Sequence, residues 1–266
     1  MNKPQIHTRL FFFDIDGTLV PNESEQGPTP GVTSALARLR DDGHKIFLCT
    51  GRTLCDIGPA LRKLNFDGII AASGAYVSVD GQCIHHRCMP LPLLRRGVEL
   101  LISNHISGVL SGPETLYYAG RGRELPWHLE RLERSSDVTA QMEIEKFTAH
   151  VRTPEEFAPL RAALEPECNI SVSDDRLFYE MTEKGTSKAT AVEILCRYLH
   201  REMEDTVAFG DSENDVPLFR KAGLRVVMGN AGPAVKQYAD YVTKPVEEDG
   251  IVSALAHFGF LGEDGI

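Results

Sequence analysis

Short runs of apolar residues alternate with segments of helical periodicity near both ends of the chain. The run Leu10–Phe13 has the length and residue type of a buried strand. A second run of this kind, Lys45–Cys49, follows a segment in which Val32, Leu36 and Leu39 fall on one helical face. Strands and helices that alternate with short connections predict parallel strands joined by right-handed crossovers.

The same patterns predict an ordered series of elements. Thr29 and Pro30 indicate the start of the first helix, as an N-cap and a proline at the first helical position. We expect strands at residues 10–13, 45–49, 68–72, 108–111, 116–118, 146–151, 169–173, 177–181, 206–209, 225–228 and 241–242. We expect helices at residues 30–42, 54–64, 91–105, 125–133, 154–164, 187–199, 216–221 and 250–257.

The alternation of strands and helices changes in the middle of the chain. Between residues 82 and 183 several strands follow one another without a helix, and residues 169–173 and 177–181 read as a hairpin. Such a pattern is typical of an antiparallel α+β module. We therefore expect an α/β fold with a doubly wound, mostly parallel sheet built from residues 1–81 and 184–266, interrupted by an inserted α+β domain at residues 82–183.

Composition narrows the class of protein. A length of 266 residues suits two unequal domains, and the hydrophobic fraction of 42% is ordinary for a soluble globular protein. The net charge of −10 argues against a nucleic-acid partner, which requires a basic surface. The apolar runs are too short to cross a bilayer, and the N-terminus has no signal-like apolar core. We expect a cytoplasmic monomer or weak homo-oligomer without a membrane partner.

Cysteine and histidine usage points to no disulfide framework. The six cysteines are scattered without a C-x-x-C pair, which suits reduced thiols better than disulfides or a zinc site. Two adjacent histidines on a strand point to opposite sides and do not face one metal ion. We therefore expect His85 and His86 to be a solvated linker pair.

Polar residues follow the predicted strands where each strand ends. Asp14 and Asp16 follow the first strand, Thr50 follows the second, Asp211 follows the strand at residues 206–209, and Lys188 lies at a helix start. In a parallel sheet these strand ends share one edge, where ligands bind. Neighbouring carboxylates repel each other unless a cation or a shared proton intervenes. The set therefore predicts a magnesium site that holds a phosphoryl group.

Four motifs together resemble the haloacid dehalogenase superfamily of phosphatases. They are Asp14-Ile-Asp-Gly-Thr18, Thr50-Gly-Arg52, Lys184-Gly-Thr-Ser-Lys188 and Gly210-Asp-Ser-Glu-Asn-Asp215. The inserted domain lies between the second and third motifs, which is similar to the Cof-type branch (subclass IIB) and its cap domain. Met228-Gly-Asn-Ala231 and Asp249-Gly250 also match that branch. The resemblance covers the core, whereas the cap matches in position and element order alone.

The resemblance implies a role for each reacting group. Asp14 is implied to be the nucleophile that forms an aspartyl-phosphate, and Asp16 to be the general acid and base. Thr50 and Gly51 are implied to bind the phosphate, and Lys188 to neutralise negative charge on the nucleophile and the phosphoryl group.

The resemblance also implies a metal site and further contacts. Mg²⁺ is implied to bind Asp14, the backbone carbonyl of Asp16, and Asp211. Asn214 is implied to contact the phosphate, and Asp215 either supports the metal indirectly or orients Lys188.

Two further residues, one after the third predicted strand and one in the second motif, have less defined roles. Ser73 stands where the branch usually has Asn, so its reach toward a substrate is shorter. Arg52 is expected to brace the second loop.

Three functions are compatible with these residues. The first is a Mg²⁺-dependent phosphomonoesterase for a small phosphorylated metabolite, either a sugar phosphate or the phosphate of a nucleotide or cofactor precursor. The second is a phosphotransferase, such as a hexose-phosphate mutase, that uses the same site. The third is a non-catalytic protein that binds a phosphate ligand, because a fold does not guarantee an activity.

Overall fold

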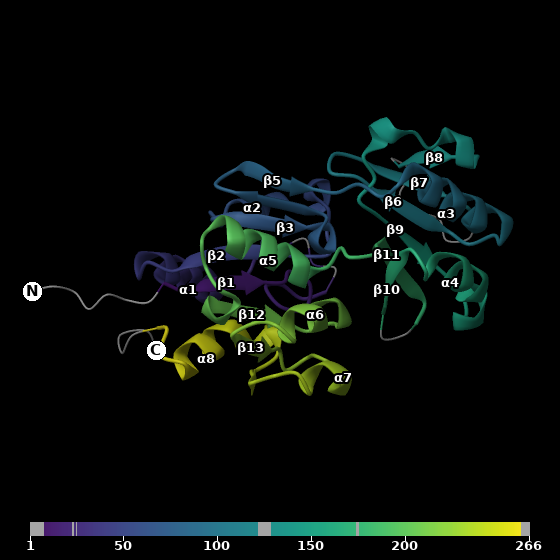
Figure 1. Cartoon of the computed structure of the whole chain (residues 1–266). Coiled ribbons are helices and arrows are strands. Elements are labelled where there is room, and N and C mark those ends of the chain that lie inside the picture. Colours follow the sequence, from purple (N-terminus) through teal and green to yellow (C-terminus); the bar gives the residue numbers. More distant parts are fainter. Residues whose placement is uncertain (1–7, 23, 25, 122–128, 174–175, 262–266) are drawn as a thin grey trace, which may run out of the picture. The chain divides into compact units, whose positions relative to one another are not determined.

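The apolar runs of the sequence form the strands of two separate sheets. The computed structural model describes residues 8–22, 24, 26–121, 129–173 and 176–261. The chain divides into two compact units, the first made of residues 1–52, 57–85 and 187–266, and the second of residues 53–56 and 86–186 (Figure 1).

The first unit contains an eight-stranded sheet in the order β14-β13-β12-β1-β2-β3-β4-β5. Its strands are β1 (Leu10–Phe13), β2 (Lys45–Cys49), β3 (Gly68–Ala71), β4 (Tyr76–Val79), β5 (Gln82–His86), β12 (Thr206–Gly210), β13 (Leu224–Val227) and β14 (Tyr241–Val242). The last residue of β5, His86, already belongs to the second unit. The pairings from β14 through β3 are parallel, and β4 is antiparallel to β3. The predicted α/β fold with a mostly parallel sheet is thereby confirmed.

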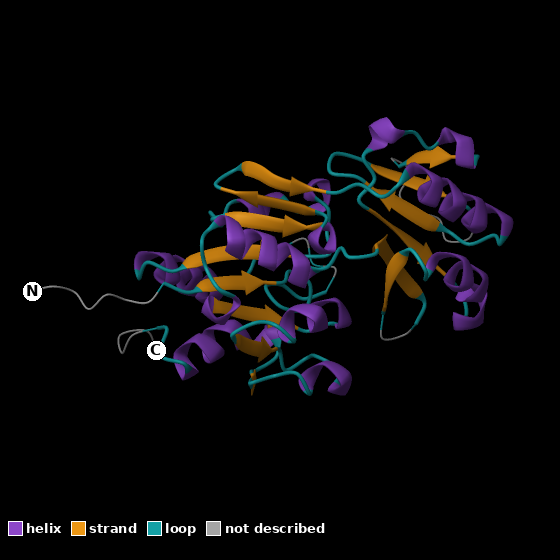
Figure 2. Cartoon of the chain, viewed as in Figure 1, coloured by secondary structure: helices purple, strands orange, loops and turns teal. Residues whose placement is uncertain are grey.

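Helices alternate with the strands of the first unit (Figure 2). They are α1 (Pro30–Asp41), α2 (Pro59–Arg62), α5 (Lys188–Tyr198), α6 (Val216–Phe219), α7 (Pro233–Lys236) and α8 (Gly250–His257). The two faces of β1 are both covered: Phe12 belongs to a core cluster with Val192 of α5, and the ring of Phe11 lies 5.0 Å from the ring of Phe260, which follows α8. Burial on both faces explains why β1 is a continuous apolar run.

Two parts of the chain between residues 54 and 86 differ from the prediction. The expected helix at residues 54–64 is wrong as a single helix, because Gly58 and Pro59 separate a 3₁₀ turn at Leu54–Asp56 from α2. The hairpin of β4 and β5 was not predicted. Its turn consists of Asp80 and Gly81 with φ values of 48° and 78°, the combination that two-residue hairpin turns require.

The second unit contains a six-stranded sheet in the order β10-β11-β9-β6-β7-β8. Its strands are β6 (Gly108–Ser111), β7 (Leu116–Ala119), β8 (Glu130–Leu132), β9 (Lys146–His150), β10 (Cys168–Val172) and β11 (Phe178–Glu183), and its helices are α3 (Leu91–Ser103) and α4 (Ala158–Leu164). The predicted hairpin is confirmed as the antiparallel pair β10 and β11. All pairings in this sheet are antiparallel except that of β7 with β8.

The expected helix at residues 125–133 is wrong where the structure describes it. Residues 130–132 form β8, which pairs in parallel with β7, while residues 125–128 lie outside the described residues. The expected helix at residues 154–164 begins with a 3₁₀ turn at Pro154–Phe157 and continues as α4. Within the described part of the chain, no helix is both long and apolar enough to span a membrane.

The N-cap residue of α1, Thr29, allows a test of how much the predicted helix start contributes to stability. Thr29 Oγ1 accepts a hydrogen bond from Val32 N at 3.2 Å and donates one to Asp249 Oδ1 at 2.5 Å. Thr29→Ala removes both bonds, so we expect the free energy of unfolding in urea to fall by about 1 kcal/mol. Thr33→Ala in the same helix is the control. Equal losses in the two variants would contradict the cap's contribution.

Candidate active site

The carboxyl ends of β1, β2 and β12 bring the predicted reacting groups to one edge of the first sheet. Phe13 of β1 is in register with Leu48 of β2 and with Phe209 of β12. Asp14 N donates a hydrogen bond to Phe209 O at 3.1 Å, which extends the pairing by one residue. The residues that follow these strands therefore meet where an open parallel sheet binds its ligands.

Lys188 occupies the centre of this edge. Its ammonium Nζ lies 3.0 Å from Asp14 Oδ1 and 2.6 Å from Asp215 Oδ1, and its side chain has no exposed surface. Lys188 is the first residue of α5, and the preceding Ser187 caps that helix by accepting a hydrogen bond from Thr190 N. The cap fixes where the helix begins, and therefore where the buried ammonium lies.

Asp215 uses both of its carboxylate oxygens. Oδ1 contacts Lys188, while Oδ2 accepts hydrogen bonds from Asp211 N at 3.0 Å and Ser212 N at 3.1 Å. Between the two readings that the sequence left open for Asp215, this geometry favours orientation of Lys188.

Burial and neighbouring charges shift the pKa values of Asp14, Asp211 and Lys188. Burial raises the pKa of Asp14 to about 7, although Lys188 opposes this shift. Burial, together with the charges of Asp14 and Asp215, raises the pKa of Asp211 to about 8. Burial alone lowers the pKa of Lys188, but Asp14 and Asp215 outweigh it and raise that pKa above its ordinary value. One ammonium, in contact with Asp14 and Asp215, thus faces a cluster of three carboxylates that includes Asp211.

This charge imbalance fits a bound cation. One oxygen from each of Asp14, Asp211 and Asp215 lies within 4.8 Å of the others. Because Asp215 is committed to Lys188 and to backbone amides, Asp14 and Asp211 are the carboxylates best placed to bind a metal ion. Carboxylate oxygens are ligands of hard divalent cations such as Mg²⁺.

Asp211 is positioned by two motif residues to which the sequence assigned no role. Thr18 Oγ1 donates to Asp211 Oδ1 at 3.1 Å, and Asn230 Nδ2 lies 3.4 Å from Asp211 Oδ2. Asn230 Nδ2 also donates to Gly17 O at 2.9 Å. Asn230 belongs to the stretch Met228–Ala231, which resembles the Cof-type branch. The sequence therefore marked this stretch but assigned no role to Asn230.

Gly17 lies against Asp211. Its φ is +73°, and a Cβ atom built there would be 2.2 Å from Asp211 Oδ2. A side chain at this position would therefore displace the carboxylate as well as strain the backbone.

Asp16 and Arg52 form a bidentate ion pair. Arg52 Nε donates to Asp16 Oδ2 at 2.8 Å, and Arg52 Nη2 donates to Asp16 Oδ1 at 2.5 Å. The backbone N of Arg52 also donates to Thr50 Oγ1 at 3.1 Å. Arg52 thus connects the loop after β2, which includes Gly51, to the loop after β1. We expected Arg52 only to brace the loop after β2, whereas it also contacts Asp16 directly.

Two remaining predicted residues lie in neighbouring loops. Ser73 is buried with φ at +53°, and its backbone N donates to Thr50 O at 3.0 Å. Asn214 Oδ1 accepts a hydrogen bond from Ser212 Oγ at 2.9 Å.

Comparison with known proteins places this geometry in a family. A family model described as haloacid dehalogenase-like hydrolase matches residues 11–255. A curated relative from Bacillus subtilis strain 168, "Putative phosphatase YkrA", is 29% identical over 96% of this chain and 99% of its own length.

Solved structures agree with the family assignment. The sugar phosphatase BT4131, of haloacid dehalogenase subclass IIB, is similar with a TM-score of 0.83 and 28% identity over 96% of this chain and 100% of that chain. The phosphatase BT1666 from Bacteroides thetaiotaomicron has a TM-score of 0.83 and 26% identity over 98% of this chain and 99% of that chain. The chain therefore belongs to the haloacid dehalogenase-like hydrolases, as its four motifs indicated, and is an enzyme of the Cof-type phosphatase branch.

Proposed function

We propose that the chain is a Mg²⁺-dependent phosphomonoesterase that hydrolyses a small phosphorylated metabolite through an aspartyl-phosphate on Asp14. The observation that carries this proposal is the buried contact of Lys188 with Asp14 and Asp215, beside Asp211. It provides a nucleophile, a fixed positive charge and carboxylates that suit a hard cation.

The proposed reaction has two half-reactions. In the first, an oxygen of Asp14 bonds to phosphorus, the bond from phosphorus to the leaving oxygen breaks, and Asp16 gives that oxygen a proton. In the second, water bonds to phosphorus, Asp16 takes the proton from this water, and the bond between Asp14 and phosphorus breaks. Arg52 fixes the orientation of Asp16 through its two hydrogen bonds in both half-reactions.

Fixed positive charge lowers the energy of the transition state in this proposal. Asp14, the backbone carbonyl of Asp16, and Asp211 would hold Mg²⁺, which when bound supplies positive charge opposite the phosphoryl oxygens. Lys188 offsets the negative charge that Asp14 brings to an anionic substrate. Thr50, Gly51 and Asn214 are proposed to hold the phosphate oxygens.

We assign substrate choice to the inserted domain. In this proposal residues 1–81 and 184–266 form the hydrolytic core, and residues 82–183 form a cap that selects the leaving group. A sugar phosphate is the first class to test, because BT4131, similar over 96% of this chain, is a sugar phosphatase. Incubation with a panel of phosphorylated sugars and nucleotide precursors, with inorganic phosphate as the readout, tests this assignment. Isomerisation of a sugar phosphate without net phosphate release would instead favour a mutase.

Removing the nucleophile tests the covalent step. We expect Asp14→Asn to lower the rate of phosphate release by more than about 1,000-fold, because the amide does not displace the leaving group. Asp41→Asn changes an exposed carboxylate at the end of α1 and serves as the control. A folded Asp14→Asn enzyme with ordinary turnover would overturn the mechanism.

Altering the cation site tests the metal. We expect chelation with EDTA to abolish phosphate release and Mg²⁺ to restore it. Asp211→Asn should raise the Mg²⁺ concentration needed for half-maximal activity by more than about tenfold, because a charged oxygen ligand is lost. Glu213→Gln, an exposed position in the same loop, is the matched control. The metal assignment fails if both variants respond to Mg²⁺ alike.

The contact of Gly17 with Asp211 gives a steric test. Gly17→Ala places a Cβ atom 2.2 Å from Asp211 Oδ2, so we expect kcat/KM to fall by about 100-fold through displacement of a proposed metal ligand. Gly43→Ala is the control, because Gly43 also has a positive φ of 85° but no atom within 4 Å of the added Cβ. It should lose stability, by about 1 kcal/mol, and keep its activity. Comparable losses of kcat/KM would refute the steric explanation.

A further inference from the structure

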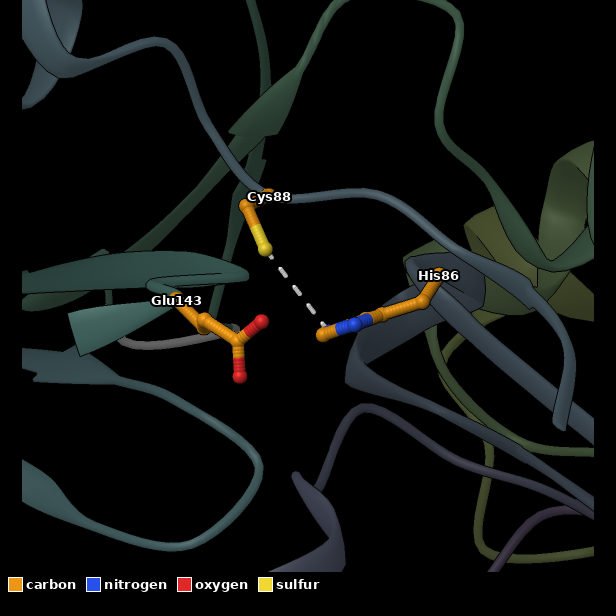
Figure 3. Close-up of side chains that lie close together, drawn as sticks. All are labelled: His86, Cys88 and Glu143. Carbon is orange, nitrogen blue, oxygen red and sulfur yellow. Dashed lines mark hydrogen bonds between the residues drawn. The ribbon is translucent and has the colours of Figure 1, made fainter. Parts of the chain in front are cut away.

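A second group of metal-ligating side chains lies in the second unit. His86, Cys88 and Glu143 each offer a ligand atom, and these three atoms lie within 4.8 Å of one another. Cys88 Sγ is 3.8 Å from His86 Nε2. Figure 3 shows the three side chains pointing toward a common space from two segments of the chain. The hydrolytic reaction proposed above uses none of them.

Backbone pairing explains why these residues meet. His86 is the last residue of β5, and Cys88 follows two residues later. Glu143 and Glu145 lie just before β9. Met89 N donates a hydrogen bond to Ile144 O at 2.7 Å, so the two segments lie side by side. Residues two apart in an extended segment point to the same side, which brings Cys88, rather than His85, to the side of His86.

Glu145 gives an independent indication that this group binds a cation. Its side chain has no exposed surface, and neither carboxylate oxygen accepts a hydrogen bond from any described residue. Oε1 lies 3.0 Å from His86 Nε2, so this carboxylate contacts the group through its histidine. A buried carboxylate without compensation is costly. An ion pair with His86 alone would leave Oε2 unsatisfied and would not account for the approach of Cys88 and Glu143.

The donor set favours one class of metal. A thiolate, an imidazole and carboxylates suit Zn²⁺ and similar borderline divalent ions, whereas Mg²⁺ selects oxygen ligands. In a tetrahedral zinc site with bonds of about 2.3 Å to sulfur and about 2.0 Å to nitrogen, these two ligand atoms are about 3.5 Å apart. The observed separation of 3.8 Å between Cys88 Sγ and His86 Nε2 is close to this value.

We propose that His86, Cys88 and Glu143 bind a zinc-class divalent cation within the second unit, beside the buried carboxylate of Glu145 and separate from the magnesium site of the first. The bound ion neutralises the buried charge of Glu145 and cross-links residues 86–88 to residues 143–145.

Cobalt spectroscopy separates this site from the magnesium site. With excess Mg²⁺ present, one equivalent of Co²⁺ added to the metal-free full-length chain should produce a thiolate-to-cobalt charge-transfer band, and Zn²⁺ should displace it. We expect Cys88→Ser to abolish the band. We expect His86→Ala, which removes a ligand, to weaken Co²⁺ binding by more than about 100-fold, and Glu145→Gln, which removes an outer-shell partner of His86, to weaken it by about 10- to 100-fold.

The controls keep the outcome independent of folding and of the proposed reaction. Cys83→Ser alters an exposed thiol of β5 that is outside the group, and it should leave the band intact. Circular dichroism and Mg²⁺-dependent phosphate release should be unchanged in Cys88→Ser without Co²⁺. Absence of the band in the unmodified chain, its persistence in Cys88→Ser, or equal loss in Cys83→Ser would each overturn the proposal.

Discussion

The buried contact of one ammonium with two carboxylates is the constraint on which the active-site edge depends. Lys188 has no exposed surface, and a lysine is rarely buried to this degree unless it is paired. Its partners come from distant parts of the chain: Asp14 follows β1, and Asp215 lies in the turn after β12. Removing one partner of such a group leaves a buried charge uncompensated, at a cost of about 3–5 kcal/mol. The start of α5 and the ends of both strands are therefore fixed together.

Much of this arrangement could be predicted from local signals. The parallel strands were evident from their apolar runs, and the convergence of Asp14 and Asp211 followed from the common edge of a parallel sheet. The contact of Asn230 with Gly17 O could not be predicted in this way, because it depends on how two loops 213 residues apart approach each other. The strand Glu130–Leu132 was missed for a related reason: it has no apolar alternation, and its pairing with β7 decides its conformation.

The proposed zinc-class site shows a limit of reasoning from adjacent residues. Neighbouring positions on a strand do face opposite ways, so the argument against a shared metal for His85 and His86 stands. The relevant neighbour of His86 is Cys88, two residues away, and the buried carboxylate of Glu145 comes from another segment. Cysteine spacing alone does not reveal a site with a single thiolate, because its remaining ligands are brought in by chain pairing. The specific chemistry of each unit depends on contacts that are distant in sequence.

The central position of β1 has a consequence for the order in which the protein folds during synthesis. β1 pairs with β12, which begins at Thr206, so the middle of the first sheet closes after the ribosome has made all of the second unit. The second unit is almost contiguous in sequence, and its pairings span shorter loops. Contacts of low sequence separation form sooner. The inserted unit is thus expected to become structured first. The Asp14 carboxylate stays hydrated until Lys188 has been synthesised and can form its ion pair with Asp14.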